Sequence, residues 1–164
     1  MNLETVRISV ATQNTKALTG RVEWMGVSAH SRSPIEVVES AMVETGKGIV
    51  GDYHGGDSSA DRQITLIQFE HLPILAAFLG RSTIDPALLR RNVVVSGINL
   101  LQFLNTRFRA GETLLEGVEP CDPCRRMEEN LGKGAIRAML GHGGIVARVL
   151  DGGRLSVGDS VQRA

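Results

Sequence analysis

The chain is short of three things: cysteine, aromatic residues and net charge. Its 164 residues include two cysteines, aromatic residues make up 4%, and the formal net charge is +0 at pH 7. Two cysteines cannot build the disulfide framework typical of small secreted domains. A neutral chain lacks the electrostatic signature of proteins that bind duplex nucleic acid through bulk charge. We therefore expect no nucleic-acid partner, and any bound anion must be held by a local site.

Long apolar runs and targeting segments are also missing. No stretch approaches the roughly 18 apolar residues that a membrane span requires. Residues 1–7 lack the basic and apolar regions of a signal peptide. We expect a cytoplasmic protein without a membrane partner. In that setting two cysteines are more often a reactive thiol, a ligand or buried structural residues than a disulfide.

The residues that are present describe one globular domain with many turns. Hydrophobic residues make up 42% of the chain, and it has 19 glycines. Apolar residues recur with period two in three segments, which predicts strands at 6–10, 22–27 and 64–67. Helical spacing appears in four short segments, at 70–78, 86–89, 125–131 and 135–140. The turn sequence Asp151-Gly152-Gly153 predicts a hairpin before a strand at 155–161.

Many short strands, few helices and no alternation of strand and helix predict a mainly β fold with short helices, of the α+β type. The expected architecture is a closed or nearly closed β-barrel with peripheral helices. Residues 1–18 are expected to form an N-terminal strand or arm, and residues 19–164 a single barrel domain.

Cys124 is the residue that most strongly suggests chemistry. It is followed directly by Arg125 and Arg126, and Cys121 lies three residues before it. Guanidinium groups and the start of a helix both stabilise a thiolate, which is the nucleophile and the soft metal ligand of proteins. A buried, inert thiol is the alternative.

Two other interpretations of the cysteine pair are weaker. The segment Cys121-Asp122-Pro123-Cys124 has the spacing of thiol oxidoreductases. Those motifs follow an early strand of a βαβ fold, whereas this one lies late in a β-rich chain. A structural zinc site would need four ligands, and the four histidines show no zinc-type spacing.

Two further segments contain candidate site residues. Residues 51–57 combine glycines with Asp52 and His54, which offer an acid, a base or a ligand. A surface turn rich in glycine and aspartate would look the same. Arg91 and Asn92 enter a β-branched run and would place guanidinium and amide groups at a strand mouth, where phosphate or a heterocycle could bind. A solvated basic strand end is the alternative there.

Taken in order, these segments resemble the MOSC domain. That module is found at the C-terminus of molybdenum cofactor sulfurases, in mitochondrial amidoxime-reducing components and in small stand-alone bacterial proteins. The resemblance covers roughly residues 19–163 and rests on the order and spacing of five motifs: Gly51-Asp52-x-His54-x-Gly56, Arg91-Asn92-x-x-x-x-Gly97-x-Asn99-Leu100, Pro123-Cys124, Gly143-Gly144-x-x-Ala147-Arg148-Val149 and Val157-Gly158-Asp159.

The resemblance implies a β-barrel that handles the molybdenum cofactor, Mo-molybdopterin, or its sulfur. Cys124 would be the molybdenum ligand or the sulfur carrier, and Arg91 and Asn92 would contact the cofactor. Asp52 and His54 match a glycine-bounded loop expected at the same mouth. Further supporting contacts are expected by charge and position from Arg125, Arg126 and Arg148.

The resemblance leaves more than one function open. The leading one is a molybdenum-dependent oxidoreductase that reduces N-hydroxylated or N-oxide small molecules. Because the sequence has no flavin or nicotinamide motif, electrons would come from a separate redox protein. The alternative is a non-catalytic carrier that delivers persulfide sulfur or the cofactor to another protein. A domain that keeps the fold without the cofactor is a third possibility. The sequence contains no pyridoxal-phosphate sulfurase domain, so no pyridoxal phosphate site is expected.

Overall fold

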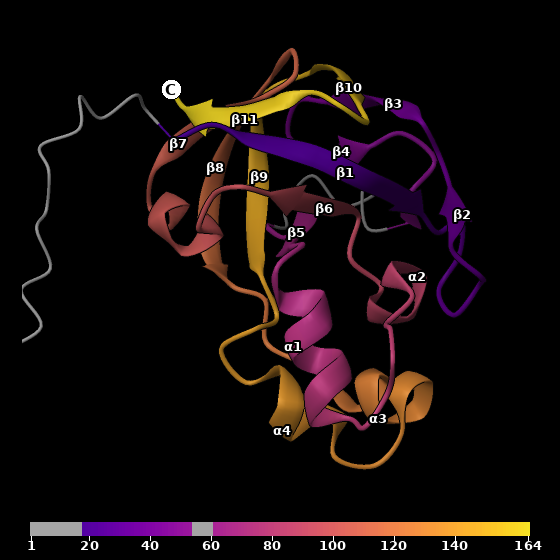
Figure 1. The fold of residues 1–164 in the computed structure, drawn as a ribbon. Coiled ribbons are helices and arrows are strands. Elements are labelled where there is room, and N and C mark those ends of the chain that lie inside the picture. The colour runs from indigo at the N-terminus through magenta and orange to yellow at the C-terminus, as the bar shows by residue number, and fades with distance from the viewer. Residues whose placement is uncertain (1–17, 54–60) are drawn as a thin grey trace, which may run out of the picture.

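The computed structural model describes residues 18–53 and 61–164. The strand expected at residues 6–10, most of the N-terminal arm and His54 lie outside these residues. Figure 1 shows a barrel of strands with a group of helices gathered at one end of it. None of the helices in the described part of the chain is long and apolar enough to cross a membrane.

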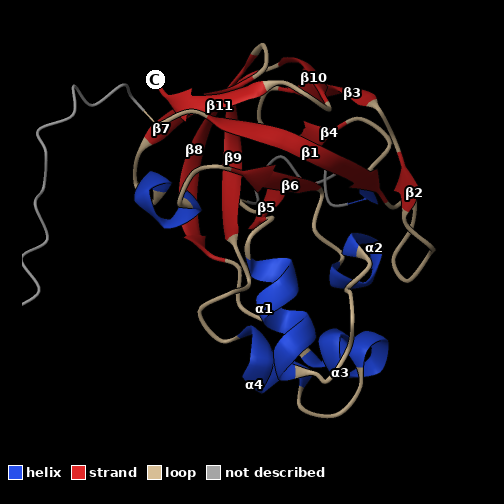
Figure 2. Cartoon of the chain, viewed as in Figure 1, coloured by secondary structure: helices blue, strands red, loops and turns tan. Residues whose placement is uncertain are grey.

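Seven strands form a closed barrel (Figures 1 and 2). Each strand pairs with the next in the order β1, β11, β7, β8, β9, β5 and β6, and β6 pairs with β1 again. Their bounds are Gly20–Val27 (β1), Ser160–Arg163 (β11), Arg107–Ala110 (β7), Thr113–Pro120 (β8), Ile145–Asp151 (β9), Ile64–Gln68 (β5) and Val93–Ser96 (β6). The closed barrel confirms the expected fold class.

In the described part of the chain, four further strands lie outside this ring. β2 (Glu36–Val37) extends the sheet beside β1. A separate three-stranded sheet has the order β10, β3, β4, with bounds Gly153–Ser156, Ser40–Glu44 and Gly48–Ile49.

The barrel closes around an apolar interior because its strands alternate in polarity. In β7, Phe108 and Ala110 are buried while Arg107 and Arg109 are exposed. Successive side chains of a strand point to opposite faces, so this alternation puts one apolar row inside. Phe108 stacks there on Phe103, with ring centroids 4.4 Å apart.

The helices pack outside the barrel over a second apolar cluster. Their bounds are His71–Phe78 (α1), Pro86–Leu89 (α2), Arg125–Leu131 (α3) and Ala135–Met139 (α4), with a 3-10 turn at Leu100–Phe103. All four expected helices are confirmed within one residue at each end. Leu75, Met127 and Met139 from three helices bury their side chains against Ile67 of β5 and Val94 of β6.

The expected hairpin at 151–153 is wrong. β9 ends at Asp151, and β10 pairs with β3 instead of with β9. At Gly152 the chain passes so close to β3 that a Cβ atom would collide with the carbonyl oxygen of Val43. The glycines therefore carry the chain from the barrel into the small sheet, and the single strand expected at 155–161 is divided into β10 and β11.

One strand–helix–strand crossover was also not expected. β5 and β6 pair in parallel, and α1 and α2 connect them. Parallel neighbours need a long connection of this kind. Parallel pairing also places the N-terminal ends of β5 and β6 at the same edge of the barrel, which brings residues 62–65 beside residues 90–92.

Candidate functional site: a cleft with two thiols and five arginines

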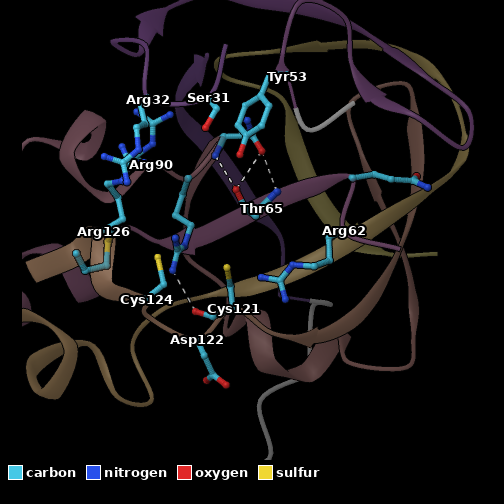
Figure 3. Close-up of a pocket in the computed structure, with 14 residues that line it drawn as sticks. Ser31, Arg32, Tyr53, Arg62, Thr65, Arg90, Cys121, Asp122, Cys124 and Arg126 are labelled. Atoms are coloured by element: carbon cyan, nitrogen blue, oxygen red, sulfur yellow. Dashed lines mark hydrogen bonds between the residues drawn. The ribbon is translucent and has the colours of Figure 1, made fainter. Parts of the chain in front are cut away.

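One cleft brings both cysteines and five arginines together (Figure 3). Its volume is about 210 Å³, and it lies where the N-terminal ends of β5 and β6, the loop between β1 and β2, and the segment between β8 and α3 meet. We call it the cysteine cleft. Its lining residues are Ser31, Arg32, Tyr53, Arg62, Gln63, Thr65, Arg90, Arg91, Asn92, Cys121, Asp122, Cys124, Arg126 and Met127.

Cys124 is the exposed thiol of the cleft. It is the residue before α3 and has an extended backbone, with φ −116° and ψ 175°. Its carbonyl oxygen accepts a hydrogen bond from Met127 N at 2.8 Å, which closes the first turn of the helix. Figure 3 shows its sulfur directed toward the cleft. The thiol is therefore accessible to a ligand from solvent.

Cys121 is the buried thiol, and its backbone is held on both sides. Its side chain is 3% exposed. Cys121 N donates to the carbonyl oxygen of Gly144 at 2.9 Å, and the Cys121 carbonyl oxygen accepts from Arg91 at 3.1 Å. Burial raises the pKa of the Cys121 thiol, and the charges of Arg91 and Arg62 oppose that effect. Cys121 is thus a protonated, positioned thiol at neutral pH.

Arg91 holds the backbone around the cleft. It is 6% exposed, and each of its three nitrogens donates to a carbonyl oxygen. Nε donates to Gly143 at 2.9 Å, Nη1 to Leu89 at 3.1 Å and Nη2 to Cys121 at 3.1 Å. The carbonyls of three separate segments therefore converge on one guanidinium, and Arg91 positions the Cys121 segment.

Asn92 joins the starts of β5 and β6 to β1. Its Oδ1 accepts from the backbone N of Thr65 at 3.1 Å and from the Thr65 hydroxyl at 3.0 Å. Its Nδ2 donates to the carbonyl oxygen of Gly26 at 3.3 Å. The side chain is buried. Asn92 therefore lines the cleft while its amide is used to fix the strand ends.

The other four arginines of the cleft differ in how their charges are balanced. Arg90 donates to the carbonyl oxygen of Ser33 at 2.9 Å and to the Ser28 hydroxyl at 3.0 Å. Arg62 forms an ion pair with Glu119. Arg126 approaches Glu129 at 3.4 Å. Arg32 is exposed and has no hydrogen bond or ion pair with any described residue.

Arg32 also has an uncommon backbone conformation. Its φ is +69°, in the left-handed region that non-glycine residues rarely adopt. The turn is held by the Ser33 hydroxyl, which donates to the carbonyl oxygen of His30 at 2.9 Å, and by Arg90, which donates to the carbonyl oxygen of Ser33. The fold thus holds at the rim of the cleft a guanidinium that has no partner among residues 18–53 and 61–164, and residues with such backbone conformations concentrate at functional sites.

The structure brings four of the expected site residues together and leaves the rest elsewhere. Cys124, Arg91, Asn92 and Arg126 line the cysteine cleft. The remaining expected residues are Asp52, His54, Arg125 and Arg148.

Asp52 is buried, and its carboxylate accepts from Ser28 N at 2.8 Å, which ties its loop to the end of β1. His54 lies outside the described residues. Arg125 is exposed on the first turn of α3 and is not among the residues that line the cleft.

Arg148 lies over a different hollow of the surface. Its Nε donates to Glu116 at 2.7 Å, and Nη1 approaches Asp61 at 3.3 Å. These hydrogen bonds raise the pKa of Arg148. Glu116 is its direct cross-strand partner between β8 and β9. The charge of Arg148 is therefore balanced by that pair, away from the thiols.

Sequence reasoning missed Arg32 and Arg62 and gave Arg90 no role of its own. Arg90 was visible as one half of the arginine pair before the β-branched run. Its φ of +52° turns the chain at the end of α2, so Arg90 and Arg91 face different partners. Arg32 and Arg62 belong to no motif that the sequence shows. They meet at the cleft only because the closed barrel brings the β1–β2 loop beside the start of β5.

A histidine pair lies next to the segment that Arg91 holds. The rings of His71 and His142 meet edge to face, with centroids 4.7 Å apart. The Nδ1 atom of each ring is buried and has no hydrogen-bond partner among the described residues. Burial, followed by the charge of His142, lowers the pKa of His71. His71 therefore favours its neutral state.

The described residues contain no group of three or more histidine, cysteine, aspartate or glutamate side chains that could hold a metal ion. Within residues 18–53 and 61–164, a structural zinc site thus has no ligand set. A cofactor that brings most of its own metal ligands needs only one thiolate from the protein.

The sequence model of the MOSC domain matches residues 50–162, which is more than half of the chain. The chain therefore belongs to the MOSC domain family. The search of curated proteins by sequence found no match.

Several solved structures share the fold. The YuaD protein from Bacillus subtilis has a TM-score of 0.77 and 23% identity, and the match covers 89% of this chain and 96% of that one. YiiM from Escherichia coli has a TM-score of 0.68 and 20% identity, with 88% and 69% covered. YiiM from Geobacillus stearothermophilus has a TM-score of 0.73 and 18% identity, with 88% and 75% covered. Likeness at these identities shows the fold alone.

Proposed function

We propose that the chain binds the molybdenum cofactor in the cysteine cleft, with Cys124 as the thiolate ligand of the metal, and that it reduces N-hydroxylated or N-oxide small molecules. The observation that carries the proposal is an exposed thiol in a cleft that also holds five arginines. Membership of the MOSC family supports the same choice of ligand.

The side chains of the cleft fit the chemistry of this cofactor. A soft thiolate suits a metal that is otherwise bound by dithiolene sulfur. Guanidinium forks suit a phosphate, because two parallel N–H groups match two of its oxygens. Arg32, which has no partner among the described residues, and Arg126, whose carboxylate partner lies 3.4 Å away, are the arginines best able to accept such a group.

The residues of the cleft would have separate roles. Cys124 would hold the metal, and Arg32 and Arg126 would hold the anionic group of the cofactor. Arg91 would keep the Cys121 segment in place through its three carbonyl contacts. When bound, the cofactor would supply two-electron oxygen-atom transfer, with electrons from a separate redox protein. The phenol of Tyr53, which lines the cleft, would hold a proton near the substrate.

Molybdenum per protein chain, measured by elemental mass spectrometry, tests the proposal. The wild type and the variants Cys124→Ser and Cys121→Ser are expressed in a bacterium that makes the cofactor. We expect near-stoichiometric metal in the wild type and in Cys121→Ser, and loss of metal in Cys124→Ser. Reduction of an N-hydroxylated amidine by the chemically reduced protein should follow metal content. Equal metal in the wild type and Cys124→Ser would sink the assignment of the ligand.

A non-catalytic sulfur carrier is the second candidate function. The observation that favours it is that a second thiol, Cys121, lines the same cleft as the exposed Cys124. A carrier would hold a persulfide on Cys124 and deliver the outer sulfur to a partner protein. Alkylation of freshly purified protein, followed by mass spectrometry of the peptide that contains Cys124, tests this. A persulfide without bound pterin would favour the carrier.

A further inference from the structure

The two cysteines of the chain line one cleft but have opposite environments, and we infer that Cys121 is a resolving thiol. After a hydroperoxide oxidises Cys124, Cys121 closes a reversible intramolecular disulfide onto it. The formation of the disulfide does not depend on the proposed function. Only its consequence, withdrawal of the thiolate that would bind molybdenum, rests on that function.

The different exposure of the two thiols sets the order of events. Cys124 is exposed and Cys121 is 3% exposed, so a soluble oxidant meets Cys124 first. Arg126 lines the cleft together with the exposed Cys124, and the thiolate is the form of a cysteine that reacts with peroxides. Cys121 is covered by protein and stays reduced until an electrophilic sulfur forms beside it.

The backbone around the pair permits closure. The backbone N–H of Cys121 is held by the carbonyl oxygen of Gly144, and its carbonyl oxygen is held by Arg91. Between the thiols lie Asp122 and Pro123, and proline has no N–H to donate. In the described chain, neither Asp122 N nor Cys124 N donates to a backbone carbonyl. The Asp122-Pro123 segment can therefore change its conformation without breaking a backbone hydrogen bond of a sheet. This freedom matters because a disulfide requires Cα atoms about 4.4–6.8 Å apart.

Figure 3 shows the two sulfur atoms directed toward the same cleft, from the segment that leaves β8 and from the start of α3. Burial is the largest cause of the raised pKa of Cys121, and the charge of Cys124 adds to it. Arg62, Arg91 and Asp122 are the other charged groups that act on Cys121. The two guanidiniums assist the departure of the Cys121 proton when its sulfur attacks.

The reaction balances with hydrogen peroxide as the oxidant. The Cys124 thiolate attacks one peroxide oxygen, so that an S–O bond forms, the O–O bond breaks and hydroxide leaves. The Cys121 sulfur then attacks the sulfur of Cys124. An S–S bond forms, the S–O bond breaks, and the hydroxyl leaves as water with the proton of Cys121. Two thiols have lost two electrons in total, and the peroxide has been reduced to water.

The test uses the full chain, reduced, freed of reductant and treated with equimolar hydrogen peroxide. Free thiols are counted with a chromogenic disulfide, and the intact mass is measured. We expect the wild type to lose both thiols together, with a mass lower by two hydrogens, and to regain both with dithiothreitol. A wild type that gains oxygen atoms, or forms disulfide-linked dimers on a non-reducing gel, would overturn the inference.

Single-cysteine variants assign the roles. In Cys121→Ser, peroxide should produce a sulfenic acid on Cys124 that dimedone traps, whereas the wild type should give little dimedone adduct. In Cys124→Ser, the remaining buried thiol should react many-fold more slowly. Because Cys121 is buried, Cys121→Ala is measured beside Cys121→Ser, and thermal unfolding confirms that both variants fold. Equal dimedone labelling of the wild type and both Cys121 variants would remove the resolving role.

Metal loading separates this inference from the proposed function. Reduced wild type is expected to accept the cofactor, peroxide-treated wild type to fall to the level of Cys124→Ser, and dithiothreitol to restore loading. If the disulfide forms but reduced protein never binds molybdenum, the resolving role stands and the proposed function fails. If reduced protein binds molybdenum and peroxide gives no disulfide, the proposed function stands and the resolving role fails.

Discussion

Arg91 donates from Nη2 to the carbonyl oxygen of Cys121 at 3.1 Å, across 30 residues of sequence. The same guanidinium holds Gly143 and Leu89. Three segments that lie far apart in the sequence therefore share one buried cation. Arg91 therefore helps to position the segment that contains Cys121.

The first prediction concerns this contact. Arg91→Lys keeps the charge but cannot reach three carbonyls that lie in different directions, so buried acceptors lose their partners. Each unsatisfied buried group costs about 1–3 kcal/mol, and we expect the free energy of unfolding to fall by about 2 kcal/mol or more. Urea denaturation measures it. The matched control is Arg32→Lys, at an exposed residue without partners in the described chain, where a change within about 0.5 kcal/mol is expected.

A second prediction concerns Gly144, which has a φ of +86°. A Cβ at this position would collide with the carbonyl oxygen of Leu66 in β5, and the carbonyl of Gly144 holds Cys121 N at 2.9 Å. Gly144→Ala should therefore cost more than about 3 kcal/mol or prevent soluble expression. Gly141 has a similar φ of +76° but open space around it.

Gly141→Ala is therefore the control for Gly144→Ala. It should cost only the left-handed conformation, about 1–2 kcal/mol. Thermal unfolding of both variants compares the two effects. Similar melting temperatures for the two variants would show that the close approach to β5 is not what requires glycine at position 144.

Arg32 provides a third prediction, which separates binding from stability. Its guanidinium is exposed at the rim of the cleft, so Arg32→Glu should leave the free energy of unfolding within about 0.5 kcal/mol of the wild type. It should weaken the retention of an anionic cofactor, because attraction becomes repulsion. Molybdenum content after gel filtration, compared at low and high salt, is the measurement. Arg107→Glu, an exposed arginine on β7, is the control and should retain metal.

The fourth prediction concerns pH and His71. Burial and the charge of His142 lower the pKa of His71, so the native state binds fewer protons than the unfolded chain does. Stability is then present above the ordinary histidine pKa of about 6.5 and is lost as the pH falls through the lowered value. Glu70, the other charged group that acts on His71, partly opposes the shift.

Urea denaturation at about pH 7 and about pH 5 measures this loss, over a window set by the ordinary histidine pKa. His71→Phe should lose less stability between the two values than the wild type. His30→Gln, at an exposed histidine of the β1–β2 loop, should show the wild-type loss. A His71→Phe slope equal to that of the wild type would mean that another group is responsible.

Local signals in the sequence were sufficient for most of the elements. α2 begins with Asp85 as its N-cap, whose carboxylate accepts from Ala87 N at 2.9 Å, and with Pro86 at the first helical position. Both preferences can be predicted from residue type. The predicted hairpin was wrong at Gly152 because this residue contacts Val43 and donates to Thr45, on and beside a strand more than 100 residues earlier. Local turn chemistry cannot reveal that choice of partner.

The candidate site was predictable only in part for the same reason. Cys124 and the Arg91-Asn92 pair carry motifs, and all three residues line the cysteine cleft. Arg148 was selected by charge and position, but it forms an ion pair with its cross-strand neighbour Glu116 outside the cleft. Arg32 lines the cleft with a positive backbone φ, which its residue type does not predict. Long-range pairing of strands decides which arginines meet the thiols.

The pairing of β1 with β11, in which Gly20 lies opposite Val161, closes the barrel. During synthesis β1 emerges before β11, so the nascent chain carries unsatisfied sheet edges on β1 and on β7 until β11 leaves the ribosome. Open edges of this kind invite pairing with other chains. A premature stop a few codons before β11 would therefore produce an aggregation-prone polypeptide, although every residue of the cysteine cleft had already been translated.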